Sequence, residues 1–243
     1  MNIIGKTILI SGGTSGIGLE IVRKLALHNR IIVISKKGKL PTELLDPEYG
    51  IQQHHLDLAH KPSLEAAVEL IQREHTSLDM LINNAAVQNT PELLSDDFNY
   101  DAIQSEIDTN FTAVCHLTYL CLPLLQAADA AHIININSGL AIAPKRESAI
   151  YCATKSAMDS FSTSLSHQFR SSSIYVQQAF LPLVATAMTE GRGKNKLRAD
   201  LVAEAIISKI GNGREVNDIG KVKLLRLINS LCRPLAKRIM REA

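Results

Sequence analysis

The sequence predicts a doubly wound α/β fold, in which a parallel sheet is covered by helices on both faces. Two kinds of segment, which alternate along the chain, favour this fold class. Short β-branched and apolar runs alternate with longer stretches whose apolar residues recur at helical spacing. Such alternation is typical of parallel sheets whose crossover connections share one hand. The chain has 243 residues, 46% of them hydrophobic, which suits a single domain around one core.

The first half of the chain opens with a strand, a turn and a helix. Residues 7–10 are β-branched and apolar, and residues 16–27 carry Ile17, Ile21 and Leu25 on one helical face. Further strands are expected at 30–35 and 51–56. A helix is expected at 62–73, where Pro62 suits the first turn.

The second half continues the alternation. Three more buried strands are expected at 78–83, 132–137 and 174–180, with helices at 102–128 and 151–170 between them. The one sharp change of composition follows Gly220. We therefore expect a body at 1–220 and a helical tail at 221–243.

Composition excludes several classes of function. A net charge of +2 is too small for a general nucleic-acid-binding surface. No apolar run approaches the roughly 20 residues that span a bilayer, and the chain begins without a charged leader. The cysteines are far apart and lack metal-ligand spacing, so we expect a reduced, cytoplasmic protein without a metal site; they are Cys115, Cys121, Cys152 and Cys232.

A glycine-rich turn lies where the first strand meets the first helix, at residues 11–18. Glycines let backbone N–H groups approach a diphosphate, whose charge is favoured at a helix N-terminus. A structural turn alone would explain one or two of these glycines. The expected cofactor-binding residues here are Gly12, Thr14, Ser15, Gly16, Ile17 and Gly18.

Three further motifs follow in order along the chain. Asn83-Asn84-Ala85-Ala86 ends the fourth expected strand, Ser138 follows the fifth, and Tyr151-Cys-Ala-Thr-Lys155 opens the next helix. Together with the turn, from about Gly5 to about Met188, they resemble the short-chain dehydrogenase/reductase family. The resemblance implies a Rossmann-type sheet of about seven strands. The tail, the Tyr-Cys-Ala-Thr-Lys motif and the Ser138-Gly-Leu-Ala141 run are together similar to a bacterial subgroup labelled DltE-like, after the D-alanyl lipoteichoic acid operon.

Tyr151 and Lys155 are four residues apart, so they share one helix face. We expect the ammonium to lower the pKa of the phenol, which would make it a usable acid and base. The resemblance implies this role for Tyr151, a ribose-holding role for Lys155, carbonyl polarisation by Ser138, and a water-linked proton relay through Asn110. Taken singly, each residue also suits a helix face, a cap or a turn.

Residues after the second strand favour NADP over NAD. An acidic residue there would hold the ribose of NAD, but this chain has Ser35, Lys36 and Lys37, which can bind a 2′-phosphate. A solvated basic loop is the alternative interpretation. The resemblance adds further cofactor contacts at Asp57, Leu58, Asn84, Ala85, Ala86, Val184 and Thr186.

The chain departs from the family pattern at three positions. Leu181-Pro182 stands where Pro-Gly is usual, Ala86 replaces a glycine, and Ser11 replaces a threonine. The segment 187–196, which would cover the substrate, is short and polar. It favours a small or polar carbonyl compound or alcohol as substrate.

The tail carries apolar residues at helical spacing among seven Lys and Arg, with no acid between 221 and 241. Three interpretations stay open: packing on the chain's own core with a break near Pro234, docking on an anionic membrane, or contact with a partner subunit. The resemblance also implies a homodimer or homotetramer.

The sequence therefore predicts an NADP(H)-dependent oxidoreductase that interconverts a carbonyl and an alcohol. Two alternatives of other classes remain, a non-catalytic NADP sensor and a membrane-docked or partner-docked scaffold. The tetrad Asn110, Ser138, Tyr151 and Lys155 favours the enzyme, because a sensor has little need for all four residues.

Overall fold

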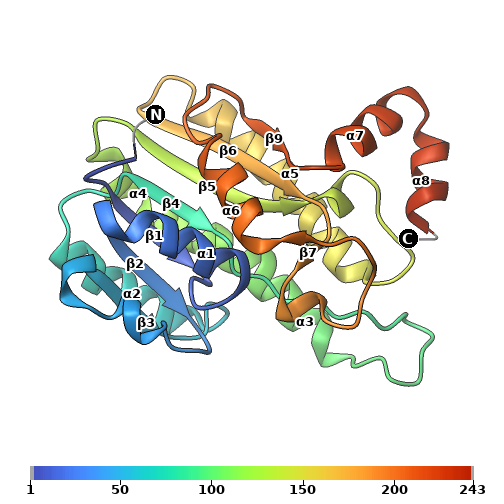
Figure 1. The fold of residues 1–243 in the computed structure, drawn as a ribbon, viewed down its shortest axis with the longest axis horizontal. Coiled ribbons are helices and arrows are strands. Elements are labelled where there is room, and N and C mark those ends of the chain that lie inside the picture. Colours follow the sequence, from blue (N-terminus) through green and yellow to red (C-terminus); the bar gives the residue numbers. More distant parts are fainter. Residues whose placement is uncertain (1–2, 242–243) are drawn as a thin grey trace.

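The computed structural model describes residues 3–241 and contains a seven-stranded parallel sheet between two layers of helices (Figure 1). The strand order is β3-β2-β1-β4-β5-β6-β9, and each neighbouring pair is parallel. The order reverses direction beside β1, where doubly wound sheets bind their ligands. The predicted fold class is confirmed.

The seven strands of the main sheet are β1 Thr7–Ser11, β2 Arg30–Ser35, β3 Ile51–His55, β4 Met80–Asn83, β5 Ala131–Ser138, β6 Ile174–Leu181 and β9 Val216–Asp218. Six of them lie where the apolar runs predict them. The seventh, β9, was not predicted. A separate pair joins β7 Val184–Ala185 to β8 Leu197–Arg198.

The α-helices are α1 Gly16–Leu25, α2 Lys61–Glu74, α3 Asp101–Ile107, α4 Ala113–Gln126, α5 Ala149–Gln168, α6 Ala199–Ile207, α7 Val222–Leu231 and α8 Arg233–Arg241. Among these residues no helix is long and apolar enough to cross a membrane.

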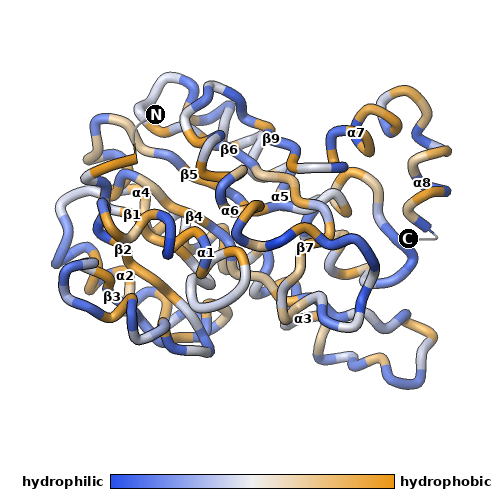
Figure 2. The backbone as a smooth tube through the Cα atoms, viewed as in Figure 1, coloured by the Kyte–Doolittle hydropathy of each residue, from blue (hydrophilic) through white to orange (hydrophobic). Residues whose placement is uncertain are grey.

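Two apolar cores cover the two faces of the sheet. On one face, Ile21 of α1 and Ile206 of α6 pack with alternate residues of the strands, such as Ile10. On the other face, Leu64 of α2 and Leu117 of α4 pack with the intervening strand residues. Successive strand residues point to opposite faces, so strands buried on both sides are nearly continuous apolar runs. Figure 2 shows these runs as orange segments within the sheet.

Two expected helices are interrupted. The helix predicted at 102–128 is divided by a π-helical turn at Asp108–Thr112. The helix predicted over the tail is two helices, α7 and α8, because Cys232 leaves helical geometry with φ −148° and ψ 81° just before Pro234. Pro234 lies in the first turn of α8, where its missing N–H costs no intrahelical hydrogen bond, whereas in one continuous helix it would remove such a bond and disfavour helical geometry before it.

Candidate active site

The glycine-rich turn joins β1 to α1 with exposed backbone donors. Ser15 precedes α1 and makes no side-chain capping hydrogen bond, and the first turn of α1 contains no acidic residue. The first N–H groups of a helix lack intrahelical partners, and they favour an anion. The turn therefore suits a diphosphate.

Two glycines of this turn have no room for a side chain. A Cβ at Gly18 would lie 2.2 Å from the Gly12 carbonyl oxygen and 2.5 Å from Asn84 Nδ2. Gly12 has φ +71°, and a Cβ there would lie 2.9 Å from Ala85 Cα. Thr186 also borders the turn, since a Cβ at Gly16 would lie 3.1 Å from its Cγ2. The turn thus lies in close contact with the end of β4 and with the side chain of Thr186, which follows β7.

Ser11 and Asn84 hold the turn against the end of β4. The backbone N–H groups of Asn84 and Ala85 each donate to Ser11 Oγ at 3.1 Å. In return, Asn84 Nδ2 donates to the carbonyl oxygens of Ser11 at 3.1 Å and Gly12 at 3.0 Å. The Asn84 amide therefore supports the turn, and Ala85 lies against Gly12. Ala86, the next residue, is half-buried.

The loop after β2 lies beside the same turn. Thr14 Oγ1 donates to the Lys37 carbonyl oxygen at 2.8 Å, and Lys36 Nζ lies 2.5 Å from Asp57 Oδ2. Burial acts to raise the pKa of Asp57, but hydrogen bonds from Lys36 and from the Ala59 N–H outweigh it and the pKa is lowered. Lys37 is exposed, and no ion pair with another described residue is recorded for it. Of the two predicted phosphate-binding lysines, Lys36 is thus paired with Asp57, and Lys37 is exposed without an ion pair to another described residue.

Three other predicted cofactor residues are largely buried. Ser35 is buried at the end of β2, where its Oγ accepts a hydrogen bond from Gln53 Nε2 at 3.2 Å. Leu58, in the loop that follows β3, packs into the core. Val184 is buried in β7, and its carbonyl oxygen accepts from Thr189 Oγ1 at 2.5 Å.

Tyr151 and Lys155 lie on the first two turns of α5, facing the end of β5. Lys155 Nζ is 5.6 Å from the centroid of the Tyr151 ring and donates to the Ile136 carbonyl oxygen at 2.9 Å. Ser138 ends β5, and its side chain is hydrogen-bonded to that of Tyr151. The three predicted residues therefore meet in one place.

Burial has the largest effect on the pKa values of Tyr151 and Lys155. It raises the pKa of Tyr151 to about 12, against the lowering effect of the hydrogen bond with Ser138. It also lowers the pKa of Lys155 to about 8. Desolvation disfavours the charged form of each group, so both become more neutral. The expectation that Lys155 lowers the pKa of Tyr151 is wrong for this structure, because desolvation of the phenol outweighs every lowering interaction and Lys155 is not among those interactions.

Asn110 lies in the π-helical turn between α3 and α4 and is fully buried. Its Oδ1 accepts from the Val87 N–H at 2.8 Å, and its Nδ2 donates to the Val87 carbonyl oxygen at 2.8 Å. Nδ2 also lies 3.3 Å from Thr154 Oγ1, beside Lys155 on α5. Isolated π-helical turns often mark functional positions. Asn110 therefore links the loop after β4 to the helix that carries the tyrosine.

Glu106 is a buried residue that sequence reasoning missed. It lies one turn before Asn110, and its Oε1 accepts from the Asn89 N–H at 2.6 Å. Burial raises the pKa of this carboxyl, and its charge in turn raises the pKa of Tyr151. The sequence signal for Glu106 was its position four residues before Asn110 in an expected helix. Usually such a residue is solvated.

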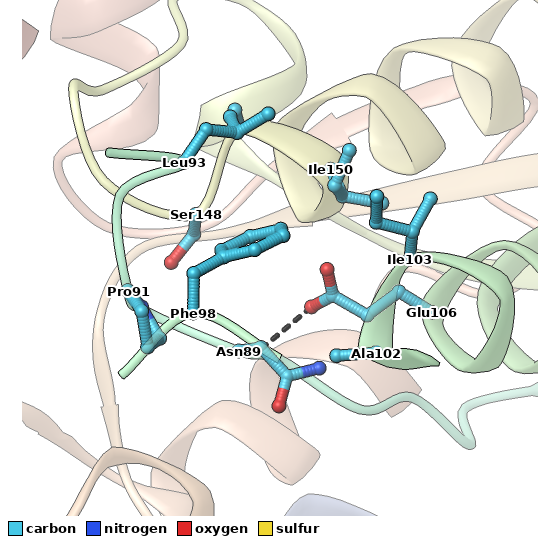
Figure 3. A pocket seen from close by; sticks show the side chains of 10 residues that line it. Asn89, Pro91, Leu93, Phe98, Ala102, Ile103, Glu106, Ser148 and Ile150 are labelled. Carbon is cyan, nitrogen blue, oxygen red and sulfur yellow. Dashed lines mark hydrogen bonds between the residues drawn. The ribbon is translucent and has the colours of Figure 1, made fainter. Parts of the chain in front are cut away.

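Figure 3 shows the Glu106 carboxyl directed into a small cavity beside the first turn of α5. The side chains of Phe98 and Ile103 form its apolar wall, and Ser148 closes one end. Ser148 begins α5 with φ 58° and ψ 45°, a strained conformation for a residue with a side chain. Tyr151 is not among the residues that line this cavity.

The segment expected to cover a substrate, residues 187–196, forms a loop closed at its base. Val184 pairs with Leu197 and Ala185 with Arg198. Within the loop, Lys196 Nζ donates to the Thr189 carbonyl oxygen. The loop thus has an internal framework, although most of its residues are exposed.

Comparison with known proteins agrees with this geometry. The family model described as short chain dehydrogenase matches residues 6–197. The chain is 34% identical over 191 residues to an uncharacterized oxidoreductase DltE of Bacillus subtilis, covering 78% of this chain and 76% of the relative. The predicted family and subgroup are confirmed.

Two solved structures share the fold at low identity. A short chain dehydrogenase of Burkholderia cenocepacia in complex with NADP has a TM-score of 0.86 at 17% identity, covering 99% of both chains. A short chain dehydrogenase/reductase of Burkholderia phymatum in complex with NAD has a TM-score of 0.82 at 19% identity, covering 95% of this chain and 96% of the other. Proteins with this fold therefore bind either dinucleotide.

Proposed function

This chain belongs to the short-chain dehydrogenase family of oxidoreductases, and we propose that it uses NADP(H) to interconvert a small carbonyl compound and its alcohol. The observation that carries the proposal is the meeting of Tyr151, Lys155 and Ser138 at the carboxyl edge of the sheet, next to an uncapped helix N-terminus. When bound, the nicotinamide supplies the hydride.

The residues that would hold the dinucleotide fit its chemistry. The N–H groups at the start of α1 would bind the diphosphate, in a turn whose shape depends on the close packing of Gly12 and Gly18 against Ala85 and Asn84. Lys36 and Lys37 would bind the 2′-phosphate of NADP beside Ser35, and Asp57 with Leu58 would contact the adenine. Lys155 would hold the ribose, and Val184 with Thr186 would contact the carboxamide.

Tyr151 would transfer the proton. Its pKa of about 12 keeps the phenol protonated near neutral pH, so it can donate to the carbonyl oxygen as hydride arrives. Ser138, which is hydrogen-bonded to Tyr151, would donate to the same oxygen and stabilise its developing charge. The protonated phenol is the form that reduction of a carbonyl to an alcohol requires. Asn110 would organise the water that resupplies the proton.

The experiment is a screen of small aldehydes and ketones that follows NADPH consumption. Wild type should turn over at least one class of compound, and Tyr151→Phe should lower kcat/KM by about 100-fold or more, because it loses its proton donor. Tyr119→Phe, at an exposed position on α4, is the matched control and should behave like wild type. NADPH binding with no turnover of any compound would instead support the sensor.

Assembly and location stay predictions. A homodimer or homotetramer is expected, and light scattering of the purified protein measures it directly. A cytoplasmic location is expected from the scattered cysteines, and cell fractionation would test it.

A further inference from the structure

Helices α7 and α8 carry an apolar surface that the rest of the described chain leaves uncovered. Leu231 is 79% exposed, and the other members are each about half exposed. Figure 2 shows the two helices at one edge of the molecule, with hydrophobic and hydrophilic residues alternating along them. We call this surface the tail stripe; it consists of Leu224, Leu227, Leu231, Leu235 and Ile239.

The opposite face of α7 holds the tail to the body. Val222 and Leu225 lie against the turn after Ser138, since a Cβ at Gly139 would lie 3.4 Å from each. Arg226 makes two hydrogen bonds of 2.8 Å with the Asp218 carboxylate and lies 4.4 Å above the Phe180 ring. The tail is therefore anchored without the stripe. Packing on the chain's own core explains the inner face of α7 and leaves the exposure of Leu224, Leu227 and Leu231 unexplained.

Charge is strongly segregated between the tail and the body. Residues 221–241 contain seven Lys and Arg and no Asp or Glu. Outside them the chain has 19 Lys and Arg against 24 Asp and Glu, a net charge of −5, as the totals of 26 and 24 require. The tail is thus a cationic amphipathic segment on an otherwise acidic protein.

Most of these cations are available to an external partner. Arg226 is paired with Asp218. Five others make no ion pair with another described residue; they are Lys221, Lys223, Arg233, Lys237 and Arg238. Exposed apolar side chains beside unpaired cations are the features by which helices bind at the surface of anionic bilayers.

We propose that the tail stripe docks this protein on an anionic lipid bilayer, with α7 and α8 lying in the interface. The leucines would enter the headgroup boundary, and the lysines and arginines would contact lipid phosphates. The contact is peripheral, since none of the described helices can span a membrane.

A second copy of the chain fits the same surface less well. Two-fold pairing of the stripe would bring two segments of seven cations together with no acid in either. Interface cores are depleted of charge, and like charges at an interface oppose association. An anionic lipid surface supplies the negative charge that a second copy lacks.

The test is flotation of the full-length protein with vesicles. Wild type should float with vesicles of equal parts phosphatidylglycerol and phosphatidylcholine at least tenfold more than with phosphatidylcholine alone. High salt should weaken the binding, because it screens the lysines and arginines. The readout does not depend on turnover, so it can succeed or fail independently of the proposed function.

Matched variants separate the stripe from general hydrophobicity. Leu227→Ser with Leu231→Ser should lower flotation at least tenfold, whereas Leu27→Ser with Leu94→Ser, at positions outside the tail that are at least as exposed, should not. Circular dichroism verifies that each variant is folded. Equal flotation of wild type and the stripe variant would overturn the proposal. So would a failure of wild type to float, together with a stripe variant of smaller mass in light scattering, which would identify a subunit interface.

Discussion

Lys36 Nζ and Asp57 Oδ2 lie 2.5 Å apart, although the two residues follow different strands. Sequence reasoning assigns the lysine to the 2′-phosphate of NADP and the aspartate to the adenine. In this structure the two side chains form an ion pair with each other, and the Lys36 side chain is 62% exposed. The pair is therefore a built-in competitor for the phosphate, and its strength should influence which dinucleotide is chosen.

Replacing Asp57 by Asn should raise the preference for NADPH over NADH. Loss of the carboxylate frees Lys36 for the phosphate, while any lost adenine contact affects both dinucleotides alike. An exposed ion pair contributes up to about 1 kcal/mol, so the ratio of the two dissociation constants should change about two- to fivefold. Titration of nicotinamide fluorescence measures it. Asp200→Asn, which breaks the exposed pair with Arg198, serves as control. An unchanged ratio would show that Lys36 does not contact the phosphate.

Replacing Lys155 by Met should stabilise the protein at pH 7 while abolishing turnover. Burial lowers the native pKa to about 8 from 10.5, so below pH 8 the native state must hold a buried ammonium. Between these values the unfolded chain binds more protons, so wild type gains stability as pH rises. After loss of the hydrogen bond to Ile136, the net gain at pH 7 should be about 1–2 kcal/mol.

Thermal melts of Lys155→Met and wild type from pH 7 to pH 10 provide the measurement. The difference in Tm should be a few degrees at pH 7 and shrink as pH approaches 10. Lys61→Met, at an exposed position, should show no pH-dependent difference. A wild type that is more stable at every pH would mean that the ammonium is well compensated.

Replacing Glu106 by Gln should also be neutral or stabilising near pH 7. Burial raises the carboxyl's pKa, so the native state holds its proton to a higher pH than the unfolded chain does. Wild type therefore loses stability as pH rises through the unfolded and then the native pKa. The amide keeps an acceptor for the Asn89 N–H. Melts from pH 4 to pH 8 should show the advantage of Gln at the upper end only, whereas destabilisation at pH 8 would indicate that a cation pairs with Glu106.

Replacing Gly18 by Ala should disable the dinucleotide turn. The added methyl would meet the Gly12 carbonyl oxygen at 2.2 Å, and backbone cannot move aside cheaply. We expect NADPH affinity to fall at least tenfold and Tm to drop. Gly213→Ala meets nothing within 4 Å but has φ +76°, so it should cost about 1 kcal/mol of stability. It should leave NADPH binding unchanged; equal losses in both variants would show a general stability effect.

Much of the fold was predictable because its strands are buried on both faces. Ile31 to Ile34 in β2 and Ile133 to Ile136 in β5 form continuous or nearly continuous apolar runs. By contrast, β9 has three residues, Val216–Asp218, and only its middle residue is buried. A break in the tail helix was expected near Pro234, and it lies at Cys232. The effect of a proline on a helix depends on where the proline falls within the turn.

The candidate site was predictable as a set of residues and less so as chemistry. The motifs around Ser138, Tyr151 and Lys155 identified groups that the structure brings together. The direction of the Tyr151 pKa shift was missed, because desolvation depends on burial that spacing along a helix does not reveal. Glu106 was missed for the same reason, since nothing in its local pattern distinguishes a buried carboxylate from a solvated one.

Titration of the purified protein with NADPH and NADH tests the central claim most directly, because it needs no knowledge of the substrate. Changes in nicotinamide fluorescence should give wild type a dissociation constant for NADPH about tenfold or more below that for NADH, a difference of about 1.4 kcal/mol or more. Lys36→Ala with Lys37→Ala should abolish the difference. Tighter binding of NADH would contradict the assigned NADP site, and binding of neither dinucleotide would contradict the proposed oxidoreductase altogether.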